Sequence, residues 1–230
     1  MSEKGILIVV SGFAGSGKGT VMKELLSGYD DYSLSISATT RAPREGEENG
    51  KHYFFVSVEE FERMIENDEL LEHARYVSNY YGTPKSYVEK ELSRGKDVIL
   101  EIETKGALIV KEKFPDTLLL FIMPPDAREI YNRLENRGTE TEEVILKRMN
   151  RACEEAEFIE KYDYLVINDD IDACVKRVHE IIRSEHLKVS RSTARIEEMK
   201  KGLEAFVKQA SGNSLISGGK KCCIRHTVTL

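Results

Sequence analysis

The sequence predicts an α/β protein in which helices flank a mostly parallel sheet. Short apolar runs rich in valine, isoleucine and leucine recur along the chain and indicate buried strands. Segments with apolar residues at helical spacing separate these runs. Such regular alternation of strands and helices is typical of a parallel sheet covered by helices on both faces.

The first strand leads into the strongest motif of the chain. The apolar run Ile6–Val10 is followed at once by a glycine-rich stretch that ends in Gly17-Lys18 and fits the spacing G-x-x-x-x-G-K from Gly12. Glycines let successive backbone N–H groups surround an anion, and a helix starting near Lys18 adds the positive end of its dipole. The motif predicts a loop that binds nucleotide phosphates.

The stretch from about 35 to 83 interrupts the alternation and predicts a small inserted lobe. Arg41 and Arg44 flank Pro43, which keeps their segment out of a regular helix. Residues 53–56 have the composition of a short strand. Ser57 with Glu60, and Ser86 with Glu89, predict capping boxes that open two helices.

The alternation resumes after the lobe. A strand is predicted over 97–103, and its period of two places Glu101 and Glu103 on one side, at the strand end where open α/β sheets bind ligands. Gly106 is expected to open the next helix. Further strands are predicted over 118–123 and 164–167, the last ending at Asn168.

Two basic helices follow the strand at 118–123. Asp126 is expected to cap a helix with Arg133 and Arg137 on one face, and a second helix carries Lys147, Arg148 and Arg151. Taken alone, such a basic face is more often a solvated surface than a site. The two helices nevertheless have the arrangement of a mobile insertion.

The chain changes character after Lys188. Ile196, Met199, Leu203 and Phe206 recur at amphipathic spacing, which predicts a helix that packs on its own domain or on a partner. The stretch 210–219 resembles a linker, and the last residues, with Cys222, Cys223 and His226, are expected to be a disordered tail and not a metal site.

Composition sets broad limits on partners and location. The 230 residues carry a net charge of −6, which argues against a broad nucleic-acid-binding surface. No apolar run approaches the roughly 20 residues that span a bilayer, and no signal-peptide pattern opens the chain. The 4 cysteines form no disulfide framework. A cytoplasmic protein without membrane contact is expected.

Several of these segments together resemble the guanylate kinases over about residues 5–187. The resemblance is carried by Gly12–Thr20, Ser37–Arg44, Gly50–Tyr53, Leu71-Glu72, Tyr80–Gly82, Leu100–Gly106, Arg133–Glu140 and Val166–Asn168. It implies a P-loop NTPase-like parallel sheet with an inserted GMP-binding lobe and a mobile lid. The implied domains are 1–187, with a core of 5–34 and 84–187, a lobe of about 35–83 and a lid of about 133–151, followed by 188–230.

The resemblance also implies a reaction and its residues. The reaction is phosphoryl transfer from ATP, with Mg²⁺, to GMP or dGMP; oligomeric state stays open. The implied catalytic residues are Lys18, Arg41, Arg133, Arg137 and Arg148. The implied ATP-binding residues are Gly12, Phe13, Ala14, Gly15, Ser16, Gly17, Lys18, Gly19, Thr20 and Asn168. The implied GMP-binding residues are Ser37, Arg41, Arg44, Tyr53, Glu72, Tyr81, Thr83, Glu101 and Glu103, and Thr20 is the candidate metal ligand.

Several residues depart from the family's commoner pattern. Gly19 stands where a serine is frequent, Phe13-Ala14 where Pro-Ser is usual, and Lys105 where glutamine is usual. Glu101 and Glu103 replace an acidic pair that is often aspartate, and Thr83 replaces a serine. Two other functions stay open: a phosphopeptide-binding module on the same fold, which typically lacks the phosphate loop, and a kinase for another nucleoside monophosphate.

Overall fold

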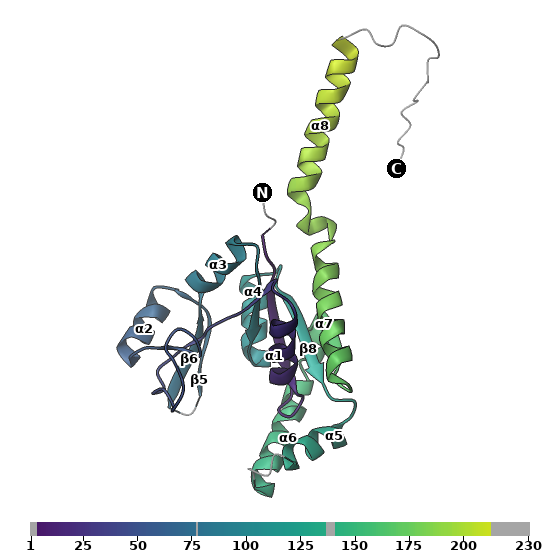
Figure 1. The fold of residues 1–230 in the computed structure, drawn as a ribbon. Coiled ribbons are helices and arrows are strands. Elements are labelled where there is room, and N and C mark those ends of the chain that lie inside the picture. Colours follow the sequence, from purple (N-terminus) through teal and green to yellow (C-terminus); the bar gives the residue numbers. More distant parts are fainter. Residues whose placement is uncertain (1–3, 77, 137–140, 213–230) are drawn as a thin grey trace. The chain divides into compact units, whose positions relative to one another are not determined.

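The structure is a computed structural model that describes residues 4–76, 78–136 and 141–212. Its contacts divide the chain into two units, residues 1–181 and 182–230. Every residue of the candidate site that the structure describes lies in the first unit. Figure 1 shows the fold and its element labels.

A five-stranded sheet forms the centre of the first unit. The strands run in the order β2-β7-β1-β8-β9, and all four neighbouring pairs are parallel. The strands are β1 (Leu7–Gly12), β2 (Tyr32–Leu34), β7 (Asp97–Glu101), β8 (Leu118–Met123) and β9 (Tyr164–Ile167). The predicted strands at 118–123 and 164–167 are therefore confirmed, the one predicted over 97–103 ends earlier, at Glu101, and β1 takes the middle place in the sheet.

Helices follow the strands of this sheet as the alternation predicted. They are α1 (Lys18–Gly28), α3 (Lys85–Ser93), α4 (Thr104–Lys113), α5 (Ala127–Glu135), α6 (Glu142–Ala156) and α7 (Ile171–His186), with the short helix η1 (Ile159–Lys161) before β9. Leu7, Val9 and Val98 of the sheet share one buried cluster with Val88 of α3 and Val110 of α4. Hydrophobic burial on this scale is the main source of the unit's stability.

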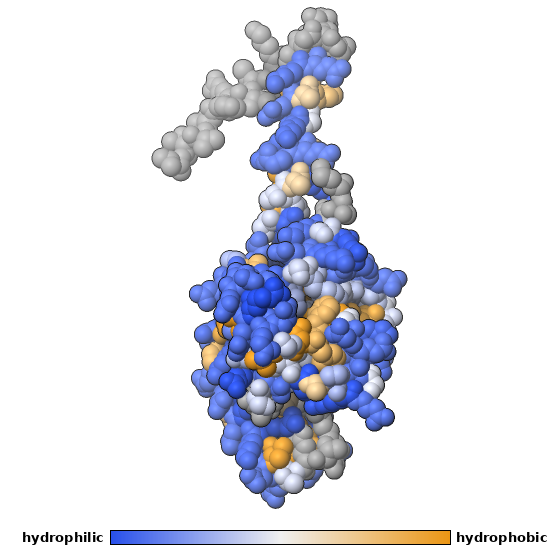
Figure 2. All heavy atoms as spheres, turned by 90° about the vertical axis from the view of Figure 1, so that its left-hand side faces the viewer, coloured by the Kyte–Doolittle hydropathy of each residue, from blue (hydrophilic) through white to orange (hydrophobic). Residues whose placement is uncertain are grey.

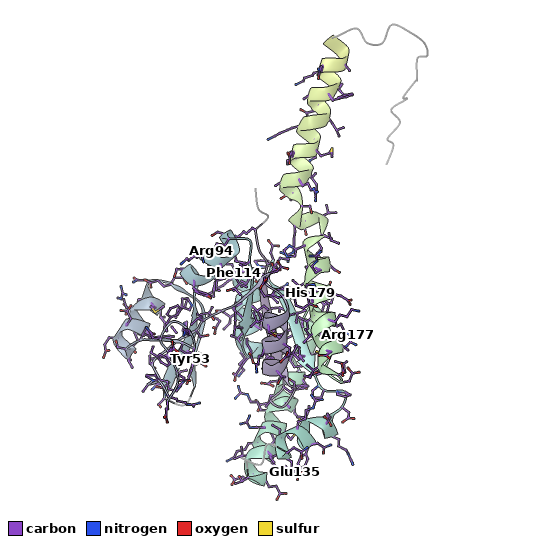
Figure 3. The ribbon with its side chains drawn as sticks, in the orientation of Figure 1. Tyr53, Arg94, Phe114, Glu135, Arg177 and His179 are labelled. Atoms are coloured by element: carbon purple, nitrogen blue, oxygen red, sulfur yellow. The ribbon has the colours of Figure 1, made fainter. Side chains whose placement is uncertain are left out.

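The start of α7 is held on the first unit by buried and aromatic contacts. Cys174 and Val178 are fully buried. The ring of His179, labelled in Figure 3, stacks on Tyr29 with centroids 3.7 Å apart, and its Nδ1 lies 2.6 Å from the hydroxyl of Tyr32. One face of the start of α7 is thus a packing surface.

The inserted lobe has its own four-stranded sheet in the order β4-β3-β6-β5. Its elements are β3 (Ala38–Thr39), β4 (Phe54–Phe55), α2 (Val58–Glu66), β5 (Leu70–Tyr76) and β6 (Asn79–Pro84). Ala38, Phe61 and Leu70 form a separate small core. In Figure 1 this sheet and α2 stand apart from the large sheet.

Two predicted helix starts are confirmed and two are wrong. The hydroxyl of Ser57 accepts from the backbone N–H of Glu60, and Asp126 accepts from that of Glu129. Ser86 is no cap, because α3 begins at Lys85 directly after Pro84. Helix α4 begins at Thr104 and not at Gly106, with Glu103 at its N-cap.

The second unit contains η2 (Val189–Arg191) and α8 (Thr193–Gly212). The predicted amphipathic helix is therefore present, and Met199, Leu203 and Phe206 are exposed on it. Cys222, Cys223 and His226 lie outside the described residues.

The hydropathy of the surface fits the high share of charged residues, 32%, in the sequence. Hydrophilic residues cover most of the face drawn in Figure 2, with a smaller group of hydrophobic residues among them. Among the described helices, none is both long enough and apolar enough to cross a membrane.

Candidate active site

The phosphate loop connects the C-terminal end of β1 to the start of α1. A cavity of about 330 Å³ lies within it, lined by Phe13–Thr20 and Glu101. Gly17 is the N-cap of α1 with a φ of 80°, and no side chain caps this helix. The first backbone N–H groups of α1 are therefore available to an anion in the cavity.

Two glycines of the loop are required by close approach. A Cβ on Gly12 would lie 2.1 Å from the carbonyl oxygen of Ile122 in β8, and a Cβ on Gly17 would lie 2.5 Å from the Asn168 amide. A Cβ on Gly19 would meet nothing within 4 Å. Steric crowding therefore does not explain the glycine at position 19.

Phe13, which departs from the family's commoner pattern, anchors the loop in the core. Its ring is buried and packs edge-on against Phe121 of β8 with centroids 5.0 Å apart. The same cluster includes Ile130 of α5 and Ala152 of α6. The loop and the two basic helices therefore share one small core.

Arg133 and Asn168 fasten the loop from outside. The Asn168 amide donates to the Ser16 carbonyl at 2.7 Å, and Asn168 is buried. Arg133 donates to the carbonyls of Ser16 and Asn168 at 3.3 and 3.0 Å, and to Glu129 at 2.6 Å. In this structure the Nη atoms of Arg133 thus contact backbone carbonyls of the loop and of Asn168, and its Nε contacts Glu129 on its own helix.

Glu101 at the end of β7 and Glu103 just after it each pair with a cation. Lys18 Nζ lies 3.2 Å from Glu101 Oε1, which places the loop lysine at the strand end. Glu103 accepts from Arg151 of α6 at 2.5 Å. The predicted strand over 97–103 was too long, because β7 ends at Glu101 and Glu103 is the N-cap of α4. The strand period therefore does not relate the two side chains, and each contacts a different cation.

Arg41 in the lobe is held by a carboxylate that the sequence analysis did not assign. Both Nη atoms of Arg41 donate to Glu47 at 2.9 Å, and Glu47 also accepts from the backbone N–H of Arg44 at 2.7 Å. These hydrogen bonds, above all those of Arg41, lower the pKa of Glu47 to about 2. The turn between positions 44 and 50 was the only sequence signal for this pairing.

Aromatic rings surround the same guanidinium. Arg41 lies over the rings of Tyr53 and Phe55, 5.4 and 5.8 Å from their centroids. Tyr81 packs edge-on against Tyr53 at 6.2 Å. Figure 3 labels Tyr53 within the lobe. The structure thus brings Arg41, Tyr53 and Tyr81 together, as the resemblance implied.

Glu72 of β5 is a buried carboxylate beside the large sheet's helices. It is 7% exposed, and Thr83 of β6 donates to its Oε1 at 2.7 Å. Burial raises its pKa, which Thr83 partly offsets. A Cβ on Gly106 of α4 would lie 3.4 Å from Glu72 Oε2, so the second oxygen faces the start of α4.

The remaining expected residues fall into three groups. Ser37 and Arg44 lie in the loops that flank β3, with Ser37 one residue before that strand. Arg148 is half-buried on α6, and Thr20 is exposed on α1 at the rim of the loop cavity. Arg137 lies outside the described residues. No group of three or more potential metal-ligating side chains occurs within the described ranges.

The comparisons with known proteins point to one family. The family model for guanylate kinase matches residues 4–185. A guanylate kinase of Caldanaerobacter subterraneus is 53% identical over 84% of this chain and 93% of its own. One from Halalkalibacterium halodurans is 56% identical over 82% of this chain and 93% of its own.

A solved structure agrees with the sequence matches. The crystal structure of guanylate kinase from Anaplasma phagocytophilum superposes with a TM-score of 0.65 at 34% identity, covering 83% of this chain and 90% of the other. The matched region contains the loop, the lobe and the basic helices described above. The chain belongs to the guanylate kinase family of P-loop kinases.

Proposed function

We propose that the protein transfers the γ-phosphoryl group of ATP to GMP and to dGMP, producing ADP and GDP or dGDP. The observation that carries this proposal is the buried Glu72–Thr83 pair in a lobe separate from the phosphate loop. A donor site and an acceptor site are thereby built from different parts of one unit. Such an activity fits purine nucleotide metabolism and GMP recycling in the cytoplasm.

The base preference follows from the chemistry of Glu72. Guanine carries two adjacent donors, N1–H and the 2-amino group, which one carboxylate accepts in parallel. Adenine has an acceptor at N1 and leaves the buried carboxylate of Glu72 unsatisfied, at a cost of about 1–3 kcal/mol or more. Glu103, Ser37 and Thr83 are the further proposed contacts of the base.

The acceptor phosphate belongs to the arginine and tyrosine group of the lobe. Glu47 takes one hydrogen from each Nη atom of Arg41, and Ala42 accepts from Nη1 at 2.8 Å. The guanidinium, which Tyr81 also approaches, carries on its Nε side the N–H groups that would make a bidentate contact with a phosphate. Arg44, Tyr53 and Tyr81 would add donors to the same phosphate.

The chemistry of transfer needs charge stabilisation more than proton transfer. The attacking oxygen of a nucleoside monophosphate is already anionic, so no general base is required. Lys18 and the loop amides would hold the donor phosphates, and Arg137 and Arg148 would approach as the lid, about 133–151, closes. Closure would also exclude water as a competing acceptor.

The residues of the loop fit a magnesium ion that arrives with ATP. Thr20 offers an exposed hydroxyl at the cavity, and Glu101 lines the same cavity. The described side chains offer no closed metal cage, so most ligands would be phosphate oxygens and water. Bound in this way, the ion would neutralise phosphate charge during transfer.

A coupled assay of ADP formation across GMP, dGMP, AMP, CMP and UMP tests the proposal. Turnover with ATP and magnesium is expected with GMP and dGMP at rates at least a hundredfold above those of the other three. Equal turnover with AMP would overturn the role of Glu72. Absence of turnover with every nucleotide, together with phosphopeptide binding, would favour the binding-module alternative.

A further inference from the structure

Arg151 on α6 makes a contact between the lid region and the acceptor side that the proposed mechanism does not use. Its Nη2 donates to Glu103 Oε2 at 2.5 Å, across 48 positions of sequence. Its Nε donates to Glu155 on the same helix at 3.4 Å. One guanidinium therefore bridges a carboxylate of α6 and the carboxylate at the start of α4.

The conformation of Glu103 depends on this contact. Glu103 occupies the N-cap of α4, but its side chain accepts no capping hydrogen bond from that helix. It is directed instead to Arg151. Burial is the main cause that raises the pKa of both Glu72 and Glu155, and the charge of Glu103 adds a smaller effect in the same direction on each, so the three carboxyl groups lie near one another. A cation among them offsets their mutual repulsion.

The part of α6 that carries Arg151 is fixed on the core. Ala152, the next residue, is buried in the cluster that contains Phe13 and Phe121. Glu155 is only 14% exposed, whereas Arg151 and Glu103 are 42% and 62% exposed. Arg151 is thus anchored at its base, while its guanidinium and Glu103 remain accessible from solvent.

We propose that Arg151 is a positioning residue for the acceptor base, acting through Glu103. It holds one oxygen of Glu103 and leaves the other for a donor group of guanine. The inference rests on the proposed function, because it requires Glu103 to contact GMP. Glu155 orients Arg151 from the opposite side. The ion pair joins α6 to Glu103 at the start of α4, so the packing of α6 on the core fixes the cation beside the proposed base contact.

The test measures the KM for GMP and for ATP in five variants: Arg151→Gln, Arg151→Lys, Glu103→Gln, the double variant of Arg151→Gln with Glu103→Gln, and Lys147→Gln as a matched control. Lys147 lies on the same helix, and its pair with Glu143 is highly exposed. We expect Arg151→Gln to raise the KM for GMP about threefold to tenfold, with kcat and the KM for ATP within twofold of wild type. Lys147→Gln should change neither KM.

The double variant shows whether Arg151 acts through Glu103. In the Glu103→Gln background, Arg151→Gln should raise the KM for GMP no further. With Glu103 intact, Arg151→Lys should give a KM for GMP between those of the wild type and of Arg151→Gln. Circular dichroism and Tm confirm that each variant is folded. A merely structural contact would change kcat and both KM values together.

The outcomes separate this inference from the function on which it rests. If Glu103→Gln raises the KM for GMP but Arg151→Gln leaves it unchanged or lowers it, the role of Arg151 is overturned and that of Glu103 stands. If Glu103→Gln has no effect on the KM for GMP, both roles fail. Specificity for GMP over AMP in the wild type would still stand independently.

Discussion

The carboxyl group of Glu72 is buried, so its ionised form is poorly solvated. This lowers the stability of the fold when Glu72 is ionised, but it leaves an acceptor for the donors of a bound base. Burial raises its pKa, so the folded protein favours the protonated carboxyl. This contribution to stability is present at low pH and is lost as the pH rises through the raised pKa. The proposed contact with guanine requires the ionised carboxylate of Glu72, so acidification through the same pH range should weaken the binding of GMP.

Glu72→Gln should therefore separate stability from function. The amide keeps an acceptor for the Thr83 hydroxyl but cannot accept two donors from guanine. We expect kcat/KM for GMP to fall at least tenfold and Tm at pH 7 to rise, with the difference in Tm shrinking as the pH falls. Kinetics and thermal denaturation across pH measure both. An unchanged KM for GMP would contradict the assignment.

Lys18 is the cation that the proposed mechanism places on the donor phosphates. Its pair with Glu101 places the ammonium at the C-terminal end of β7. Lys18→Met should lower kcat at least a hundredfold, the scale of removing one donor from a transition state, while GMP binding by calorimetry stays within about threefold. Lys23→Met, an exposed position on the same helix, serves as the control. Surviving turnover would show that the loop is not the catalytic element.

Helix α2 illustrates how a single element supports the acceptor lobe. Ser57 caps it, and the helix buries Phe61 in the lobe's small core with Ala38 and Leu70. Ser57→Ala should reduce the free energy of unfolding by about 1 kcal/mol, whereas Ser57→Asp, which can still cap, should retain most of it. Urea denaturation measures the loss. An equal loss in both variants would show that the cap hydrogen bond contributes little.

Some predicted helices and strands are determined by residues within the element itself, and others depend on the chain around them. Strand β1 follows from the unbroken apolar run Ile6–Val10, so the sequence alone was enough. The start of α3 was mispredicted because Pro84, with its fixed φ, already provides the residue before the helix, and Ser86 falls inside it. Which residue caps a helix depends on the backbone path that leads into the helix, and a pattern of a few residues in the sequence does not fix that path.

The site was predictable where residue type alone dictates chemistry, as in the loop from Gly12 to Thr20. The partners of its charged groups were not. Arg151 and Glu103 are 48 positions apart, and only the packing of α6 against the core brings them together. Arg41 and Glu47 are close in sequence, but their pairing depends on the turn between them. Ion pairs follow from the fold, so a sequence shows candidates without their partners.

At the scale of the whole molecule, the described candidate site lies within residues 1–181 and the family match ends at residue 185. A chain ending at residue 192, between η2 and α8, should therefore keep kcat and both KM values within about twofold of the full chain. A chain ending at residue 170 loses α7, with Cys174 and Val178 fully buried in the intact protein, and should not fold. Kinetics and circular dichroism on the two truncations test this. A large loss of activity at residue 192 with a folded protein would assign the second unit a part in the reaction.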